Sequence, residues 1–270
     1  AYGMNLAVDM AKEAGLGVVG VRNSHHFGAA GVYARIAARR GAIGLVTSAT
    51  RGVTMVPTRG AKPVLGTNPI AFAAPAGRNL PFVLDMATTT TAAGKVKVYD
   101  LNERAMPAGW VVDGAGNPVT DAKRGMKILH EEPEGGLSPL GGSPEMASHK
   151  GYGLAMMVHI LGGTLVGSSF SPIRNRMQQP NDPDDIGHFF MAIDPKAFRE
   201  DGAFEADLDE VVDVLHATPP ADPALPVLVP GDPEAESRET RLREGIPVPE
   251  SLQARIRDVC LRSNAEYLLG

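Results

Sequence analysis

Two adjacent histidines, His25 and His26, stand between an apolar run and a helical pattern. Residues 18–21 predict a buried strand, and residues 31–39 predict a helix. In α/β proteins, ligands bind at the edge of the sheet where a strand ends and a helix begins. A histidine at this edge suits proton transfer, because its unperturbed pKa of about 6.5 lies near working pH. The position equally suits a histidine that only hydrogen-bonds backbone groups at the helix start, so the pattern predicts two alternatives.

A second polar stretch follows the apolar run over residues 82–84, which predicts another strand. Asp85 comes at its end, and a run of threonines at 88–91 then opens a predicted helix. Backbone N–H groups and hydroxyls at such a helix start could face outward and hold a ribose diol or a phosphate. The same residue types are also ordinary helix caps, with Asp85 or a threonine at the N-cap.

Two further segments carry a hydroxyl or a cationic side chain that could bind a ligand. Residues 42–47 predict a buried strand that ends in a polar segment containing Thr50, which suits a ribose, a carboxylate or a plain turn. Lys150 precedes an apolar helical pattern over residues 152–166. A lysine at a helix N-terminus opposes the helix dipole unless an anion binds there, although it can equally be a solvent-facing side chain.

Two glycine-containing segments could form binding sites, of which the first is rejected and the second stays a candidate. Residues 15–20 match Gly-x-Gly-x-x-Gly, but here a predicted helix ends and a strand follows, the reverse of the order that places a phosphate at a helix N-terminus. Residues 229–234 (Val-Pro-Gly-Asp-Pro-Glu) predict a tight turn whose acceptors could hold ribose hydroxyls.

Composition bounds the class of protein. The chain has 270 residues, 43% of them hydrophobic and 21% charged, with a formal net charge of −5, which indicates a globular protein without a nucleic-acid footprint. The single cysteine, Cys260, excludes an internal disulfide framework and favours a reducing compartment such as the cytoplasm. The longest apolar run, residues 151–167, is short for a membrane span, and no His/Cys spacing predicts a metal site.

Periodicity supplies the remaining elements. It predicts helices over residues 4–14, 208–217 and 250–262, strands over residues 70–75 and 188–195, and a strand, a turn and a strand over residues 110–121. His188 alternates with Phe189 on its strand, which favours a core or sheet-surface position.

Three motifs carry a resemblance to a known family. Residues 23–28 (Asn-Ser-His-His-Phe-Gly) resemble the Asn-Ser-x-His-Phe-Gly signature of the type 2 malate/L-lactate dehydrogenases, with the fixed histidine at His26. Asp85-Met86-Ala87 followed by threonine, and Lys-Gly-Tyr-Gly-Leu from Lys150, are similar to two further motifs of that family. The family includes malate, sulfolactate and ureidoglycolate dehydrogenases and some cyclic imine reductases. The resemblance extends over essentially the whole chain.

The resemblance implies an α/β fold with a mixed sheet and surrounding helices, a nucleotide-binding fold that is not a Rossmann domain. It implies hydride exchange between NAD or NADP and a small 2-hydroxy or 2-oxo acid such as malate or lactate, in a cytoplasmic homodimer without nucleic-acid or membrane partners. His26 would transfer the substrate proton. The residues that would bind the cofactor are Thr50, Asp85, Met86, Ala87, Lys150, Gly231, Asp232 and Glu234.

The resemblance also implies one catalytic and cofactor-binding unit over residues 1–270, with a core over approximately 20–195 and flanks at 1–19 and 196–270. The family's N-terminal segment, which contributes a Ser-His pair and an arginine to the substrate site, is not part of this sequence. A substrate carboxylate needs such a cation, and Arg22 or Arg51 could supply it. The alternative is a cofactor-binding protein of the same fold without turnover.

Overall fold

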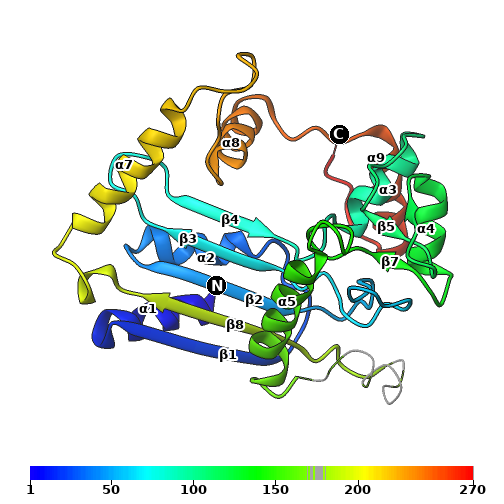
Figure 1. Cartoon of the computed structure of the whole chain (residues 1–270), viewed down its shortest axis with the longest axis horizontal. Coiled ribbons are helices and arrows are strands. Elements are labelled where there is room, and N and C mark those ends of the chain that lie inside the picture. Colours follow the sequence, from blue (N-terminus) through cyan, green and yellow to red (C-terminus); the bar gives the residue numbers. More distant parts are fainter. Residues whose placement is uncertain (169, 171–172, 174–178, 180, 270) are drawn as a thin grey trace. The chain divides into compact units, whose positions relative to one another are not determined.

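Five strands form the central sheet of the protein, in the order β1-β8-β2-β3-β4 (Figure 1). The computed structural model describes residues 1–168, 170, 173, 179 and 181–269, and these fall into two units, residues 1–227 and 228–270. The sheet belongs to the first unit. Its strands are β1 (Leu16–Ser24), β2 (Ile43–Ala49), β3 (Ile70–Ala74), β4 (Phe82–Met86) and β8 (Ile186–Ile193).

Every neighbouring pair in this sheet runs antiparallel. The α/β class is confirmed, but the predicted mixture of parallel and antiparallel strands is not what the sheet shows. The parallel pairing in the described residues is the isolated bridge between Met55 and Leu137. The run at 18–21 is a strand, as predicted, but β1 lies at the sheet edge and leaves Leu16 and Val18 exposed.

Helices α1 (Tyr2–Ala14) and α2 (Gly31–Arg39) cover one face of the sheet and bury its largest apolar cluster. Met4 and Val8 of α1 lie in this cluster with Val46 and Phe190 of the sheet, so α1 is part of the core. The helix ends at Gly15, whose left-handed backbone closes the C-cap, and β1 begins directly after it. This order confirms that residues 15–20 are not a phosphate-binding loop.

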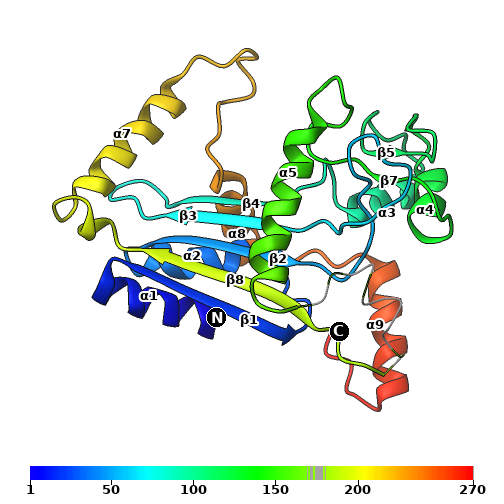
Figure 2. The ribbon, with the colours of Figure 1, turned by 60° about the horizontal axis from the view of Figure 1, so that its bottom comes forward.

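Helix α5 (Ser148–His159) and the π-helical turn η1 (Ile160–Thr164) cover the opposite face (Figure 2). The close approach requires glycine, because a Cβ at Gly162 would lie 3.0 Å from the backbone nitrogen of Ala49. The structure confirms a helix in the predicted range 152–166. It begins four residues earlier, at Ser148, so Lys150 lies inside its first turn.

A smaller layer consists of β5 (Val111–Val112), β6 (Pro118–Val119) and β7 (Gly136–Leu137) with α3 (Ala93–Leu101) and α4 (Ala122–His130). The strand, turn and strand predicted over 110–121 are confirmed. The threonines at 88–91 do not open a helix, because α3 starts only at Ala93.

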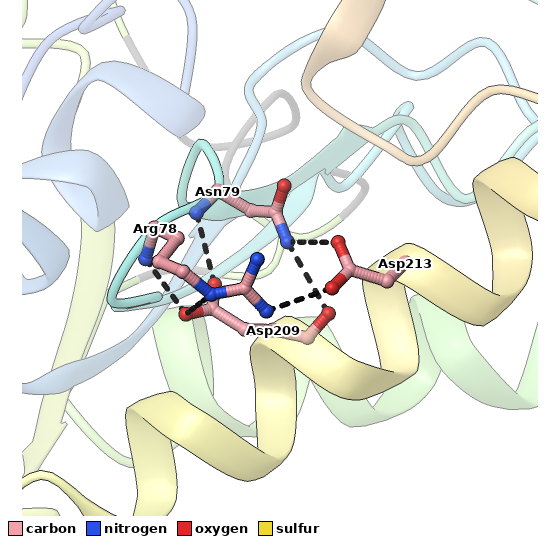
Figure 3. Close-up of polar contacts among 4 residues, drawn as sticks. All are labelled: Arg78, Asn79, Asp209 and Asp213. Atoms are coloured by element: carbon pink, nitrogen blue, oxygen red, sulfur yellow. Dashed lines mark hydrogen bonds and ion pairs between the residues drawn. The ribbon is translucent and has the colours of Figure 1, made fainter.

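The turn between β3 and β4 is tied to α7 (Ala203–Ala217), which follows the short 3-10 turn η2 (Pro195–Ala197). Buried Asp209 of α7 accepts hydrogen bonds from the backbone N–H groups of Arg78 (2.7 Å) and Asn79 (2.9 Å), as Figure 3 shows. Asp213, one turn later, pairs with the Arg78 guanidinium at 2.7 Å and accepts a hydrogen bond from the Asn79 amide at 2.9 Å. These bonds attach α7 to the sheet.

Replacing Asp209 by asparagine is expected to lower the melting temperature by several degrees, because one of the two carboxylate oxygens that accept backbone hydrogen bonds from Arg78 and Asn79 is lost. The hydrogen bonds from Asn79 and Arg78 hold the pKa of the Asp209 carboxyl below its usual range. Its stabilising contribution is therefore present above the unfolded pKa of about 3.9 and is lost as pH falls through the folded value. Thermal unfolding at pH 7 and at pH 3 measures both effects. Asp213→Asn is the matched control, and an equally large change there would contradict the special role of Asp209.

The second unit contains α8 (Asp232–Glu244) and α9 (Glu250–Ser263). The helix predicted over 250–262 is confirmed, whereas the charged stretch of α8 is helical although no helix is predicted there. Among the described residues, no helix has both the length and the apolar character needed to cross a membrane. Within the same ranges, no group of three or more His, Cys, Asp or Glu side chains could hold a metal ion.

Candidate functional site

The loop between β1 and α2 carries His26, so the histidine lies where a strand ends and a helix begins, as predicted. Its side chain is exposed, and its Nδ1 accepts a hydrogen bond from the backbone N–H of Gly28 at 3.2 Å. Gly28 has a left-handed backbone (φ 81°), and no atom lies within 4 Å of the position of a Cβ there. The His26 side chain is therefore exposed, and the space at the Gly28 Cα is open.

His26 lines a pocket of about 440 Å³. The walls come from the loop after β1, the end of β2 and the loop after it, the turn before β3, the start of α3 and the segment before β8. Thr50, Arg51 and Asp184 also line this pocket. All of these residues belong to the first unit.

Arg51 is the arginine that the fold brings to His26. Arg22 lies exposed on β1 and is not among the described residues that line the pocket. The Arg51 guanidinium pairs with one oxygen of Asp184, and His25 Nδ1 lies 3.0 Å from the other oxygen. The hydrogen bond with His25 and the charge of Arg51 hold the pKa of Asp184 below its usual range, so Asp184 is a carboxylate that orients Arg51.

Thr50 lines the pocket, but a side chain of the protein already engages it. Its backbone N–H and its hydroxyl both donate to Oδ1 of Asn68, each at 3.2 Å. Asn68 is buried and donates to the carbonyl of Ala155 in α5 at 3.0 Å, which fixes the end of β2 against that helix. A different pocket residue, Thr54, has a buried hydroxyl for which the described residues supply no partner.

Asp85 and Met86 end strand β4, and Ala87 follows them. The exposed Asp85 carboxylate accepts a hydrogen bond from the backbone N–H of Gly31 at 2.8 Å. Gly31 is the first residue of α2. Asp85 thus caps a helix from another part of the chain. The alternative that Asp85 or a threonine is the N-cap of the following helix is wrong, since Ala92 holds the N-cap position of α3 and makes no side-chain capping bond.

The threonine hydroxyls do not face outward as predicted. Thr88 donates to the carbonyls of Thr67 (3.0 Å) and Asn68 (3.1 Å), and Thr90 donates to the carbonyl of Pro139 at 2.8 Å. The Thr88 bonds hold the segment after β4 against the turn before β3, which lines the pocket, and the Thr90 bond holds it against the loop after β7. The threonines therefore shape the wall, and the pattern of hydroxyls alone did not show this.

Lys150 is exposed in the first turn of α5 and is not among the described residues that line the pocket. The remaining predicted binding residues lie at the start of α8 in the second unit, where left-handed Gly231 (φ 114°) is the N-cap. Asp232 accepts a hydrogen bond from the Val229 backbone N–H at 2.7 Å and closes the predicted turn. Glu234 lies in the first turn of α8.

The pocket combines a histidine able to exchange a proton and a guanidinium able to bind a carboxylate. This arrangement suits proton transfer on a small anionic substrate. Asp184 and Thr54 line the pocket but are not among the site residues predicted from the sequence. An acidic run at 182–185 is visible in the sequence, but its distance in the chain from Arg51 conceals the pairing.

Comparison with known proteins agrees with this chemistry. A family model described as malate/L-lactate dehydrogenase matches residues 1–257. The chain is 36% identical to malate dehydrogenase of Pyrococcus horikoshii over 98% of its own length and 71% of the relative. It is 36% identical to L-sulfolactate dehydrogenase of Methanothermobacter thermautotrophicus, over 94% and 68% of the two chains. The crystal structure of malate dehydrogenase from Entamoeba histolytica superposes with a TM-score of 0.91 at 30% identity, covering 99% of this chain and 74% of that one.

Proposed function

This chain belongs to the malate/L-lactate dehydrogenase family of NAD(P)-dependent oxidoreductases, and we propose that it exchanges a hydride with a small 2-hydroxy or 2-oxo acid such as malate or lactate, with His26 moving the substrate proton. The observation that carries the proposal is that His26 and Arg51 line one pocket. A 2-hydroxy acid needs a base at its hydroxyl and a cation at its carboxylate, and these two side chains supply them.

The hydrogen bond of His26 indicates which ring nitrogen carries the lone pair that accepts the substrate proton. Because Nδ1 accepts from the Gly28 N–H, the neutral ring carries its hydrogen on Nε2 and keeps its lone pair on Nδ1. In oxidation the substrate hydroxyl takes the place of the Gly28 N–H and gives its proton to Nδ1. In reduction, protonated His26 returns the proton to the substrate oxygen. The exposed ring and the open space at Gly28 permit this exchange of partners.

The chain's polar groups fit a dinucleotide. The Asp85 carboxylate is exposed and can accept hydrogen bonds from ribose hydroxyls, and Lys150 offers a cation for a phosphate. Bound NAD or NADP supplies the hydride acceptor or donor. The residues of the first unit proposed to hold it are Thr50, Asp85, Met86, Ala87 and Lys150, whereas cofactor binding by Gly231, Asp232 and Glu234 of the second unit stays a prediction from the family resemblance.

Replacing Lys150 by alanine is expected to raise the cofactor Kd by roughly tenfold, since a charge-assisted hydrogen bond contributes about 1.5–3 kcal/mol. Fluorescence titration with NADH and with NADPH measures the Kd of each nucleotide. Lys97→Ala removes an equally exposed lysine from α3 and serves as the charge-matched control. If both variants bind as the wild type does, Lys150 does not contact the cofactor.

The reaction itself is tested by following the absorbance of NADH or NADPH with a series of 2-oxo acids. Turnover of a carboxylate-bearing 2-oxo acid, and none of the matched ketone without the carboxylate, supports the proposal. Saturable cofactor binding without turnover of any acid supports the alternative, a cofactor-binding protein of the same fold. Absence of both binding and turnover contradicts the proposal.

We also propose that the protein is a homodimer. Exposed apolar side chains lie on β1 (Leu16 and Val18), on η1 (Ile160) and directly after η1 (Leu165). Because β1 and η1 contact each other, these side chains support a surface for a second copy. Sedimentation equilibrium measures the mass, and a monomer at micromolar concentration would contradict this assembly.

For the cellular compartment we propose the cytoplasm. The support is the single cysteine, Cys260, which is free in this chain and suits a reducing environment. Fractionation of cells that express the protein tests the proposal.

A further inference from the structure

His188 of β8 is a buried histidine that lines no part of the pocket, yet it touches the loop that carries His26. Its Nδ1 lies 2.9 Å from the hydroxyl of Ser48 in the neighbouring strand β2. Its Nε2 lies 3.2 Å from the backbone carbonyl of His25 and 3.0 Å from the hydroxyl of Ser24. The imidazole therefore bridges the centre of the sheet and the residues just before His26.

The partners define the form of the ring. A backbone carbonyl can only accept, so Nε2 carries the hydrogen and donates it to His25, while Nδ1 accepts from the Ser48 hydroxyl. Burial lowers the pKa of His188 to about 4, although the bond to the His25 carbonyl opposes this. The ring is therefore neutral near neutral pH, and its orientation does not change with protonation there.

A second contact reaches the loop on the other side of His26. The ring of Phe27 stacks on His188 with a centroid distance of 4.3 Å and an interplanar angle of 1°. Phe27 in turn stacks on Tyr33 of α2 at 4.8 Å, and the Tyr33 hydroxyl donates to the Phe27 carbonyl at 2.6 Å. His188 thus holds the chain at His25 and at Phe27, one residue to each side of His26.

Regular backbone pairing between β1 and β8 does not hold the loop that carries His26. The register between β1 and β8 shifts between Val21 and Ser24, and Asn23 within the shift has a left-handed backbone (φ 54°). The backbone ladder is thus irregular just before the histidine loop. Side chains hold the loop where the ladder is disturbed: His188 of β8 contacts it at the His25 carbonyl and at Phe27, and Asp184 and Asp185, just before β8, bond to the His25 ring and to the Asn23 backbone N–H.

We propose that His188 is a positioning residue for His26, and that its hydrogen bond to the His25 carbonyl keeps the His26 imidazole aimed at the substrate. The inference rests on the proposed role of His26 in proton transfer. A displacement of about 1 Å at a reacting group can slow a reaction about 10²-fold, so a loosened loop lowers the rate of the chemical step more than it lowers binding.

Two variants of His188 separate the bond to the loop from simple burial. Glutamine places an amide N–H where Nε2 stands, and asparagine reaches Ser48 but not the His25 carbonyl. We expect His188→Asn to lower the single-turnover rate of hydride transfer by about 10–100-fold with an unchanged cofactor Kd, and His188→Gln to recover most of that rate. Phe189→Leu is the matched control, because Phe189 is the next residue of β8, is equally buried and faces the opposite side of the sheet. It should lower the melting temperature and leave the rate unchanged.

The double variant His26→Ala/His188→Asn identifies the route of the effect. If His188 acts through His26, the double variant is as slow as His26→Ala alone. A further loss by the same factor as in His188→Asn would show a general structural effect and overturn the inference. So would a wild-type rate in His188→Asn while His26→Ala is slow. A wild-type rate in His26→Ala would instead remove the proposed role of His26 itself.

A readout without turnover completes the test. The NMR chemical shift of the His26 Cε1–H proton in the free protein should move in His188→Asn and stay in place in His188→Gln and in Phe189→Leu. An unchanged His26 resonance in all three variants would contradict the positioning role, whatever the catalytic rates are.

Discussion

Replacing His26 with alanine is expected to lower the rate of hydride transfer by about 10²–10⁴-fold and to leave the cofactor Kd unchanged, because a positioned base or acid contributes an effect of that size. The imidazole lines the pocket and is exposed, and among the described residues its hydrogen bond is the 3.2 Å contact with the Gly28 N–H. Stopped-flow absorbance at 340 nm under single-turnover conditions measures the step directly.

The adjacent histidine provides the control. His25→Ala removes an exposed imidazole whose ring bonds to Asp184, so hydride transfer at saturating substrate should remain near the wild-type rate. Equal losses in the two variants would mean that the loop as a whole, and not the His26 ring, supports the reaction. A wild-type rate in His26→Ala would assign the proton transfer to another group.

Replacing Arg51 with methionine is expected to raise KM for a 2-oxo acid by about 10–100-fold, with a smaller change in the cofactor Kd. A hydrogen bond to a charged group contributes about 1.5–3 kcal/mol, and each 1.4 kcal/mol corresponds to a tenfold change. Arg51 reaches the pocket with its charge held by Asp184, so the guanidinium is preorganised for a planar anion. Initial rates over a range of acid concentrations give KM and kcat separately.

Arg22→Met is the matched control for Arg51, because it removes the same charge from an exposed position on β1 outside the described pocket lining. Its KM should stay within about twofold of the wild type, as for most surface substitutions. Asp184→Asn leaves Arg51 in place but removes the carboxylate that orients it, and we expect an intermediate rise in KM. If Arg22→Met raises KM as much as Arg51→Met does, the substrate carboxylate does not select Arg51.

Local patterns were sufficient for much of the fold. The helix over residues 31–39 and the strands at 42–47, 70–75 and 188–195 appear within a few residues of their predicted bounds, because periodic burial and capping are properties of neighbouring residues. The same local order excluded a phosphate loop at residues 15–20, where Gly15 caps α1 and β1 follows. It also placed His26 between a strand and a helix.

Local patterns misled where a residue's partner lies far along the chain. Asp85 was expected to cap the helix after it or to face a ligand, but its carboxylate caps α2 through Gly31, 54 residues earlier. The threonines that follow have carbonyl partners in other segments, so their hydroxyls turn inward. A side chain's choice of partner depends on what the fold brings within about 3 Å, and sequence spacing does not contain that information.

The sequence by itself determined the class of elements, the place of His26 and the family resemblance that the comparisons confirmed. Only the tertiary structure showed that Arg51 lines the pocket with His26, because the Asp184 that pairs with Arg51 lies 133 residues away in the chain. Only the tertiary structure brought His188 of β8 against the His26 loop, 163 residues from the His25 carbonyl that it holds. Helices and strands follow from neighbours in sequence, whereas a site is assembled from side chains that meet once the sheet has formed.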